Sequence, residues 1–323
     1  MAPTPSDNPP VDTILKKVLE AVPFQLTADG GVHEARRRLR DLPRRPLHPD
    51  LRVEDHSIKG PAGPIPVRVY WPDTEPPEAG YPVTLFFHGG GFALGDLDTH
   101  DATAREHAVG ADTVVVSVDY RLAPEHPYPA AVEDAWAATC WAAENAGRLG
   151  ADASRLAVAG DSAGGNLSAV MAHLARDAHR AGGGPDIVFQ LLWYPATTWD
   201  TSLPSFTENA TAPILDRDAM AAFTEWYAGH IDPAEPPPGL APARADDLTG
   251  LAPAYIAIAG HDPLRDDGAH YAELLTAAGV HVELHNAETL VHGYLGYSGV
   301  VPAATEATAR GLAALHAALH PNR

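Results

Sequence analysis

The chain has 323 residues, of which 45% are hydrophobic and 20% are charged. This length suits one large α/β domain that carries an insertion, and the composition supports a sizeable core rather than disorder. The formal net charge of −20 would repel a nucleic acid or an anionic membrane surface, so neither is expected as a partner. The single cysteine, Cys140, rules out an internal disulfide and a cysteine-based zinc cluster.

The N-terminal region shows no sign of export or membrane anchoring. Its first residues lack the basic start of a signal peptide, and Lys16, Lys17 and Glu20 interrupt the first apolar segment. No apolar run approaches the length that a bilayer-spanning helix needs. These features predict a cytoplasmic protein. Within residues 11–22, apolar side chains recur at helical spacing and predict an amphipathic helix with one face to bury.

From residue 53 onward, the pattern predicts a mostly parallel sheet between layers of helices. Two short β-rich segments, 53–59 and 65–71, flank a break rich in Gly and Pro and are expected to pair antiparallel. Later strands are continuous apolar runs, as expected for parallel strands that are buried on both faces. We expect these strands at 83–87, 113–118, 156–159, 187–193, 255–259 and 282–285, and helices near 130–147, 163–180, 267–278 and 303–319. This alternation is typical of a doubly wound α/β fold, whose sites lie at the carboxyl ends of the strands.

One long segment breaks the alternation of strand and helix. About sixty residues separate the strands near 194 and 255, which is too long for a bare loop and indicates an inserted part of a cap. One helix, 216–228, is expected within it. We therefore divide the chain into an N-terminal cap part (1–50), a first core part (51–194), an inserted cap part (195–250) and a second core part (251–323). Four aromatic side chains of the cap parts either line a substrate pocket or pack internally: Phe24, Phe206, Phe223 and Trp226.

The segment Gly160-Asp161-Ser162-Ala163-Gly164 fits the G-x-S-x-G pattern of a serine nucleophile. It follows an apolar strand and opens a helix, a context in which small neighbours permit the sharp and strained turn that the serine needs. The helix N-terminus also presents a positive dipole and free N–H groups to a developing oxyanion. We therefore expect Ser162 to be a nucleophile rather than part of a mere Gly-rich connection.

A second Gly-rich segment, His88-Gly89-Gly90-Gly91, directly follows a predicted strand. Successive glycines lose much conformational entropy on folding, and their use is the close approach of backbone N–H groups to a ligand oxygen. A phosphate-binding loop is the alternative, but neither G-K-[ST] nor G-x-G-x-x-G occurs here. The amides of Gly90, Gly91 and Ala163 are the expected oxyanion hole, and His88 and Gly89 form the supporting loop.

A nucleophilic serine needs a base, and the base needs an orienting carboxylate, which in this fold class follow the serine in the order Asp or Glu, then His. Asp262 comes directly after a predicted strand, whereas Asp266 and Asp267 are expected to favour the dipole of the next helix. Among 17 histidines, His292 lies beyond the last strand and is the expected base, with His285 a weaker candidate. No metal-ligand spacing such as H-E-x-x-H occurs, so a metallohydrolase has little support.

The candidate site residues lie in five short segments: His88–Gly91, Asp119–Pro127, Gly160–Asn166, Asp262–Asp266 and His292–Gly293. The resemblance that these segments carry runs in register from near residue 50 to the C-terminus. In combination they resemble the bacterial hormone-sensitive-lipase-like carboxylesterases. The resemblance implies an α/β-hydrolase fold with an eight-stranded sheet, only the second strand antiparallel, and a two-part helical cap. It also implies cofactor-free hydrolysis of short- to medium-chain acyl esters through an acyl-enzyme, and in many members a homodimer.

Two charged residues, Arg121 and Glu125, lie close to a strand end in one of these segments. As substrate ligands they would bind a polar group. A structural ion pair that fixes the loop is the preferred interpretation, so neither is counted among the catalytic residues.

Two other functions are compatible with the same fold. Plant gibberellin receptors resemble this family but lack the catalytic histidine, whereas Ser162, Asp262 and His292 are all present here. An amide, carbamate or lactone hydrolase would use the same triad, because the choice of leaving group depends on the shape of the pocket. The predicted partner in either enzymatic case is a small molecule, and for an esterase it is a small-molecule ester.

Overall fold

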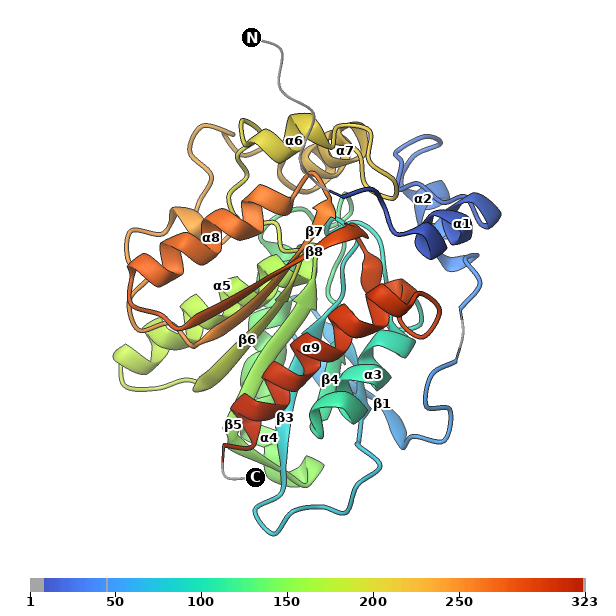
Figure 1. Ribbon diagram of the computed structural model, residues 1–323. Helices are drawn as coiled ribbons and strands as arrows, with labels where there is room; N and C mark the ends of the chain where they lie inside the picture. Colours follow the sequence, from blue (N-terminus) through green and yellow to red (C-terminus); the bar gives the residue numbers. More distant parts are fainter. Residues whose placement is uncertain (1–8, 45, 322–323) are drawn as a thin grey trace.

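The computed structural model describes residues 9–44 and 46–321, and its centre is one eight-stranded sheet (Figure 1). The strands are β1 (Val53–Lys59), β2 (Pro64–Tyr70), β3 (Tyr81–Phe87), β4 (Val114–Val118), β5 (Ala151–Asp161), β6 (Ile187–Trp193), β7 (Ala254–His261) and β8 (Val282–Val291). Their order across the sheet is β1-β2-β4-β3-β5-β6-β7-β8. Only β2 runs antiparallel to its neighbours, and all other pairs are parallel. The expected α/β-hydrolase sheet is therefore confirmed.

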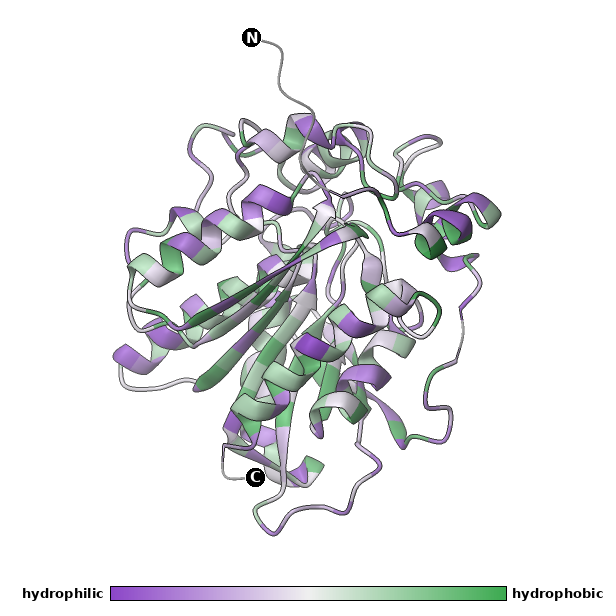
Figure 2. Cartoon of the chain, viewed as in Figure 1, coloured by the Kyte–Doolittle hydropathy of each residue, from purple (hydrophilic) through white to green (hydrophobic). Residues whose placement is uncertain are grey.

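Helices cover both faces of this sheet. On one face lie α4 (Ala130–Asn145), α5 (Ala163–Arg180) and α8 (Arg265–Ala277), and on the other lie α3 (Asp101–Ala111) and α9 (Pro302–Leu319). Side chains of β5 point alternately to the two faces of the sheet. Leu156 and Val158 pack in the hydrophobic core with α4 and α5, and Ala157 and Ala159 pack in the core with α3 and α9. In Figure 2 the strands are largely hydrophobic, whereas the helices mix both kinds of residue. This is the pattern of a parallel sheet buried on both faces.

Two segments lie beside the carboxyl ends of the strands (Figure 1). The N-terminal segment holds α1 (Thr13–Ala21) and α2 (Val32–Arg40), and the inserted segment holds α6 (Pro204–Glu208) and α7 (Arg217–Ala228). The described residues also hold three short 3-10 helices: η1 (Ala146–Leu149), η2 (Pro242–Arg244) and η3 (Tyr294–Tyr297).

Backbone contacts tie the N-terminal segment to distant parts of the chain. The Asp12 N–H donates to the Thr289 carbonyl at 2.9 Å, and the Leu26 N–H donates to the Ile214 carbonyl at 2.8 Å. The first contact reaches β8, and the second joins the N-terminal and inserted segments. The N-terminal segment therefore docks on the end of the sheet through residues that lie far away in the sequence.

The predicted elements are found, with three additional helices and some longer strands, such as β5, which spans Ala151–Asp161 instead of 156–159. Helices α2, α3 and α6 were not expected, and β8 continues to Val291 instead of ending at residue 285, so that His292 follows the strand directly. No helix among the described residues is long and apolar enough to cross a bilayer. Residues 1–8, which contributed to the prediction about export, lie outside the described residues, and the cytoplasmic location stays a prediction.

Candidate active site

The turn between β5 and α5 places Ser162 at the carboxyl edge of the sheet. Ser162 has φ 56° and ψ −116°, a strained backbone conformation for a residue with a side chain. Its N–H donates to the Trp193 carbonyl at 2.8 Å, which fixes the turn to the neighbouring strand β6. A Cβ atom added to Gly164 would collide with the Phe87 carbonyl oxygen of β3. The small residues of the motif are thus required by the close approach of helix and sheet.

Three predicted residues form one hydrogen-bonded series. His292 Nε2 lies 2.9 Å from Ser162 Oγ, and His292 Nδ1 lies 2.7 Å from Asp262 Oδ2. The other carboxylate oxygen of Asp262 accepts the Leu264 N–H at 2.8 Å. Asp262 is 0% exposed and His292 is 3% exposed. Because an ionised carboxylate can only accept, Nδ1 carries the proton and Nε2 is left to accept from the serine hydroxyl.

The rival carboxylates do not contact His292 in the described residues. Asp266 accepts the Ser205 N–H at 2.8 Å, and Asp267 accepts from the backbone and hydroxyl groups of Thr197 and Thr198. Both lie in the first turn of α8, as expected. The interpretation that they merely favour the helix dipole is incomplete, however, because they anchor the inserted segment to the core. Burial raises the pKa of Asp267, and the hydrogen bonds from the two threonines oppose that rise.

The orientation of the Gly-rich loop follows from its carbonyl groups. His88 Nδ1 donates to the Gly89 carbonyl at 2.8 Å, and the Gly90 carbonyl accepts from the N–H groups of Ala93 and Leu94 at 3.1 and 2.8 Å. In a trans peptide the N–H points opposite to the carbonyl. The N–H groups of Gly90 and Gly91 therefore point away from these contacts. Gly90 has φ 118° and Gly91 has φ 60°, which glycine adopts without strain.

His88 lies beneath the loop as a neutral ring. Burial lowers the pKa of His88 to about 4, and the ring stacks on Tyr120 with centroids 4.3 Å apart. The Tyr120 hydroxyl donates to the His88 carbonyl at 2.6 Å. His88 thus orders the loop, and the described residues show no hydrogen bond between it and Ser162.

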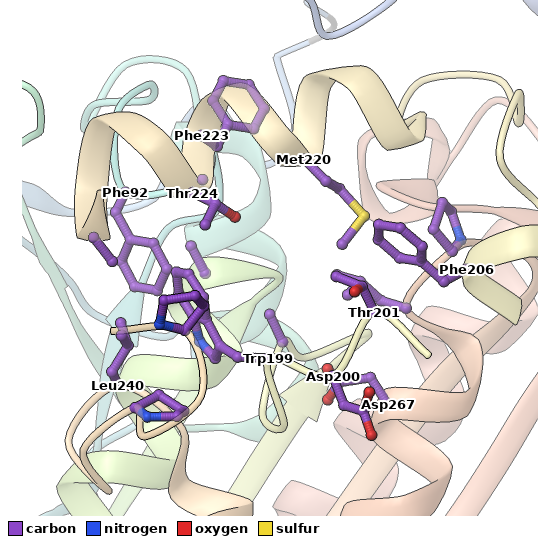
Figure 3. Close-up of a pocket in the computed structure, with 18 of the residues that line it drawn as sticks. Phe92, Trp199, Asp200, Thr201, Phe206, Met220, Phe223, Thr224, Leu240 and Asp267 are labelled. Atoms are coloured by element: carbon purple, nitrogen blue, oxygen red, sulfur yellow. The ribbon is translucent and has the colours of Figure 1, made fainter. Parts of the chain in front are cut away.

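A pocket of about 450 Å³ opens above Ser162, within the range of small-molecule sites. Figure 3 shows Phe92, Trp199 and Leu240 on one side of it and Met220 and Phe206 on the other. Of the four aromatic residues left open by the sequence, Phe206 and Phe223 line the pocket, whereas Phe24 and Trp226 pack against the hydrophobic cores. The pocket is therefore an apolar site with the serine in its wall.

The expected ion pair between Arg121 and Glu125 is wrong. Arg121 instead pairs with Asp134, at 2.9 Å, and with Glu133, at 3.0 Å. Glu125 pairs with Arg36 of α2 at 2.7 Å. Each residue still fixes its loop, Arg121 to the following helix α4 and Glu125 to α2 in the N-terminal segment.

Elsewhere in residues 9–44 and 46–321, no three His, Cys, Asp or Glu side chains lie close enough to hold a metal ion. Cys140 of α4 is partly exposed, and burial raises the pKa of its thiol. The described residues therefore offer neither a metal site nor a reactive cysteine as a second candidate site.

Comparison with known proteins identifies the relatives of this chain. The model of the alpha/beta hydrolase fold family matches residues 84–296. The chain is 67% identical over 317 residues to the esterase LipI of Mycobacterium tuberculosis, covering 98% of each chain. It is 60% identical over 319 residues to the carboxylesterase NlhH of the same organism, covering 97% of this chain and 98% of the relative.

A solved structure agrees with these relatives. The hyperthermophilic esterase from Pyrobaculum calidifontis superimposes with a TM-score of 0.84 at 38% identity, covering 96% of this chain and 99% of that one. The resemblance to carboxylesterases inferred from the motifs is thereby confirmed. The chain belongs to the α/β-hydrolase fold family.

Proposed function

We propose that this chain is a serine carboxylesterase that hydrolyses esters of short- to medium-chain acids. The observation that carries the proposal is the hydrogen-bonded series Ser162–His292–Asp262 in the wall of an apolar pocket of small-molecule size. The names of the two mycobacterial relatives, an esterase and a carboxylesterase, support it. The substrate is a small-molecule ester.

The proposal gives each residue of the site a role in the reaction. His292, oriented by Asp262, takes the proton from Ser162 as its oxygen attacks the ester carbonyl. The amides of Gly90, Gly91 and Ala163 stabilise the resulting oxyanion; Ala163 is the first residue of α5, and its N–H has no acceptor inside the helix. His292 then protonates the departing alcohol, and a water molecule repeats the sequence on the acyl-enzyme.

The cap is the second part of the proposal. Residues 1–50 and 195–250 form it, and residues 51–194 and 251–323 form the core. Its support is that Leu26 from the first segment and Trp199, Met220 and Phe223 from the second line the same pocket as Ser162. A cap of this kind excludes water from the oxyanion and sets which acyl groups fit.

The test is the variant Ser162→Ala assayed on p-nitrophenyl butyrate. Turnover should fall by a factor on the order of 10⁴ or more, and a serine-directed phosphonate should label the native chain at Ser162 only. An acyl-length series should show a maximum at short to medium chains. Retained turnover in Ser162→Ala would overturn the assignment, and faster cleavage of a matched amide than of the ester would move the chain to the amidases.

The oligomeric state and the location complete the proposal. β8 lies at the edge of the described sheet with a neighbour on one side, and its outer edge offers backbone groups to a second copy. We propose a cytoplasmic homodimer. Light scattering across a dilution series measures the mass, and a constant monomer mass would contradict the dimer.

A further inference from the structure

A buried carboxylate lies directly behind the oxyanion loop. Asp161, the last residue of β5, is 8% exposed. Its Oδ1 accepts the Gly89 N–H at 2.8 Å, and its Oδ2 occupies the space that a Cβ atom on Gly89 would need. The side chain therefore holds the loop by a hydrogen bond and by direct packing.

This carboxylate completes the fixation of the first peptide of the loop. The carbonyl of the His88–Gly89 peptide accepts the Tyr120 hydroxyl, and the N–H of the same peptide donates to Asp161. Both ends of the peptide are therefore fixed. The next two peptides are held by hydrogen bonds to the Gly89 and Gly90 carbonyls. Because they follow the His88–Gly89 peptide directly, the directions of the Gly90 and Gly91 amides also depend on how that peptide is held.

A negative charge at this position is unfavourable for the reaction itself. Asp161 precedes the nucleophile, and a carboxylate near a developing oxyanion opposes its charge. Burial also raises the pKa of Asp161, but the nearby His100 ring and the Gly89 amide outweigh burial and leave the pKa below its ordinary value. Asp161 is thus ionised at neutral pH. The Gly89 N–H therefore donates to a charged acceptor, which makes a stronger hydrogen bond than a neutral one.

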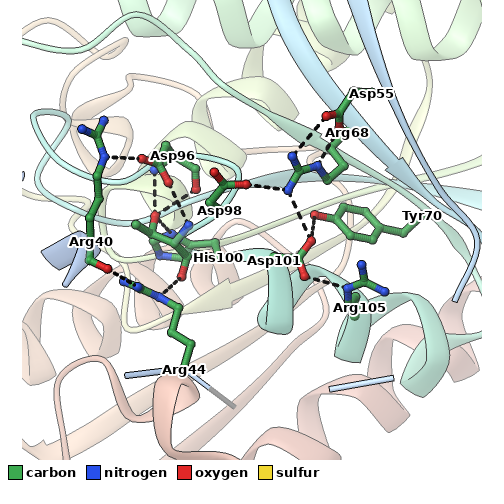
Figure 4. A network of polar contacts seen from close by, with 11 residues as sticks. Arg40, Arg44, Asp55, Arg68, Tyr70, Asp96, Asp98, His100, Asp101 and Arg105 are labelled. Atoms are coloured by element: carbon green, nitrogen blue, oxygen red, sulfur yellow. Dashed lines mark hydrogen bonds and ion pairs between the residues drawn. The ribbon is translucent and has the colours of Figure 1, made fainter. Parts of the chain in front are cut away.

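His100 braces the carboxylate from the other side. Its Nε2 lies 3.7 Å from Asp161 Oδ1, and its ring stacks on His88 with centroids 5.2 Å apart. Its Nδ1 lies 3.0 Å from Thr99 Oγ1. Thr99 and Asp96 exchange hydrogen bonds, and Asp96 pairs with Arg40 of α2 at 2.8 Å (Figure 4). The contacts run without a break from the N-terminal segment to the oxyanion loop.

We propose that Asp161 is a positioning residue for the oxyanion hole, whose carboxylate, braced by His100, anchors the His88–Gly89 peptide so that the next two amides face the reacting carbonyl. The inference rests on the proposed esterase function. It concerns a group that does not touch substrate and acts through the loop.

The experiment compares Asp161→Ala and Asp161→Asn on p-nitrophenyl butyrate. Loss of the anchor in Asp161→Ala should lower kcat by about 10²-fold with KM within about threefold, because the misplaced donors act on the oxyanion and not on the bound ester. Asp161→Asn keeps an acceptor for the Gly89 N–H and should lose no more than about tenfold in kcat. A kcat of Asp161→Ala within about threefold of the native value, or equal losses in both variants, would overturn the inference.

A second readout separates positioning from a general structural role. An alkyl trifluoromethyl ketone adds to Ser162 and places an oxyanion in the hole, whereas the matching methyl ketone binds as a ground-state analogue. In Asp161→Asn, the inhibition constant of the trifluoromethyl ketone should rise by the factor by which kcat/KM falls, and that of the methyl ketone should stay the same. Equal changes for both ketones would contradict positioning. This readout decides the question where Asp161→Ala does not fold.

The chain offers a matched control in Asp134. This carboxylate is 1% exposed and also accepts a backbone N–H, that of Arg121, at 2.9 Å, but it belongs to α4 and holds the connection that precedes this helix. Asp134→Asn should lower the melting temperature and leave kcat unchanged. If Ser162→Ala abolishes turnover while Asp161→Ala leaves kcat intact, the positioning role fails and the esterase function stands.

Discussion

The floor and the roof of the pocket are built in different ways. We use floor for the turn 160–164 with the loop 88–91, and roof for residues 24–26 with the inserted segment 195–250. In the floor, the closest approach is between backbone atoms: Gly164 lies against the Phe87 carbonyl, and the Ser162 N–H donates to the Trp193 carbonyl. In the roof, side chains form many of the hydrogen bonds between segments, as Gln25 does with the Ile214 N–H and with the Asp216 carboxylate. The floor therefore has no room for change, whereas the roof can be altered one contact at a time.

The first way to test this difference is to add a methyl group to the floor. Gly164→Ala should reduce the free energy of unfolding by on the order of 3 kcal/mol, because the new Cβ meets backbone that cannot rotate away. Urea unfolding measures the change. Gly147→Ala is the control, since a Cβ there meets nothing within 4 Å. Equal midpoints for the two variants would show that the floor can accommodate an added methyl group.

A second test concerns the partly buried carboxylate of Asp119, which precedes Tyr120, the residue whose hydroxyl donates to His88 in the floor. Burial and the neighbouring Asp96 raise the pKa of Asp119 from 3.8 to about 6. The favourable protonated form is fully present below pH 3.8 and is lost as the pH rises through 6, so the charged form opposes folding at neutral pH. Asp119→Asn should therefore raise the free energy of unfolding by about 1–2 kcal/mol at pH 7.5.

The pH dependence supplies the control for Asp119. The gain should shrink as the pH falls and should vanish near pH 4, where Asp119 of the native chain is already neutral in the folded state. Urea unfolding of both proteins at several pH values measures the gain at pH 7.5 and its loss near pH 4. A gain that persists unchanged at pH 4 would assign the effect to packing instead of charge.

The smallest effect is expected in the roof. Gln25 Nε2 donates to Asp216 Oδ2 at 3.1 Å, so Gln25→Glu places two carboxylates together. We expect KM for p-nitrophenyl butyrate to rise by about three- to fivefold, equivalent to about 1 kcal/mol, with kcat retained. Combining Gln25→Glu with Asp216→Asn restores a donor and an acceptor and should recover the native KM. A double variant no better than the single one would show that Gln25 does not join the two segments.

The sheet could be predicted because its signal is strong and local. The residues of β3 are all buried, and such a continuous apolar run is rare outside a parallel sheet. Helix α3 escaped prediction because its buried residues are mainly small, Ala104, Ala108 and Ala111, beside polar Thr103 and His107. These side chains form only a weak apolar stripe along the helix. Helix α2 has four arginines among its nine residues and presents a similarly weak stripe.

The site was predictable where chain order carried the information. Ser162, Asp262 and His292 follow the order of the fold class, and the structure brings them together. The bonds of Arg36 to Glu125 and of Asp161 to Gly89 join residues 89 and 72 positions apart. The spacing of residues in the sequence does not predict such contacts. Long-range side-chain partners depend on tertiary packing, which explains why the pairing of Glu125 was wrong.

The contact between Asp12 and Thr289 has a consequence for how the molecule is made. The N-terminal segment is synthesised before its backbone partners, which are Ile214 and Thr289 of β8. Its contact with β8 can therefore form only after residue 289 has been synthesised. The segment that supplies Leu26 to the pocket is thus fixed in place late, although it comes early in the sequence.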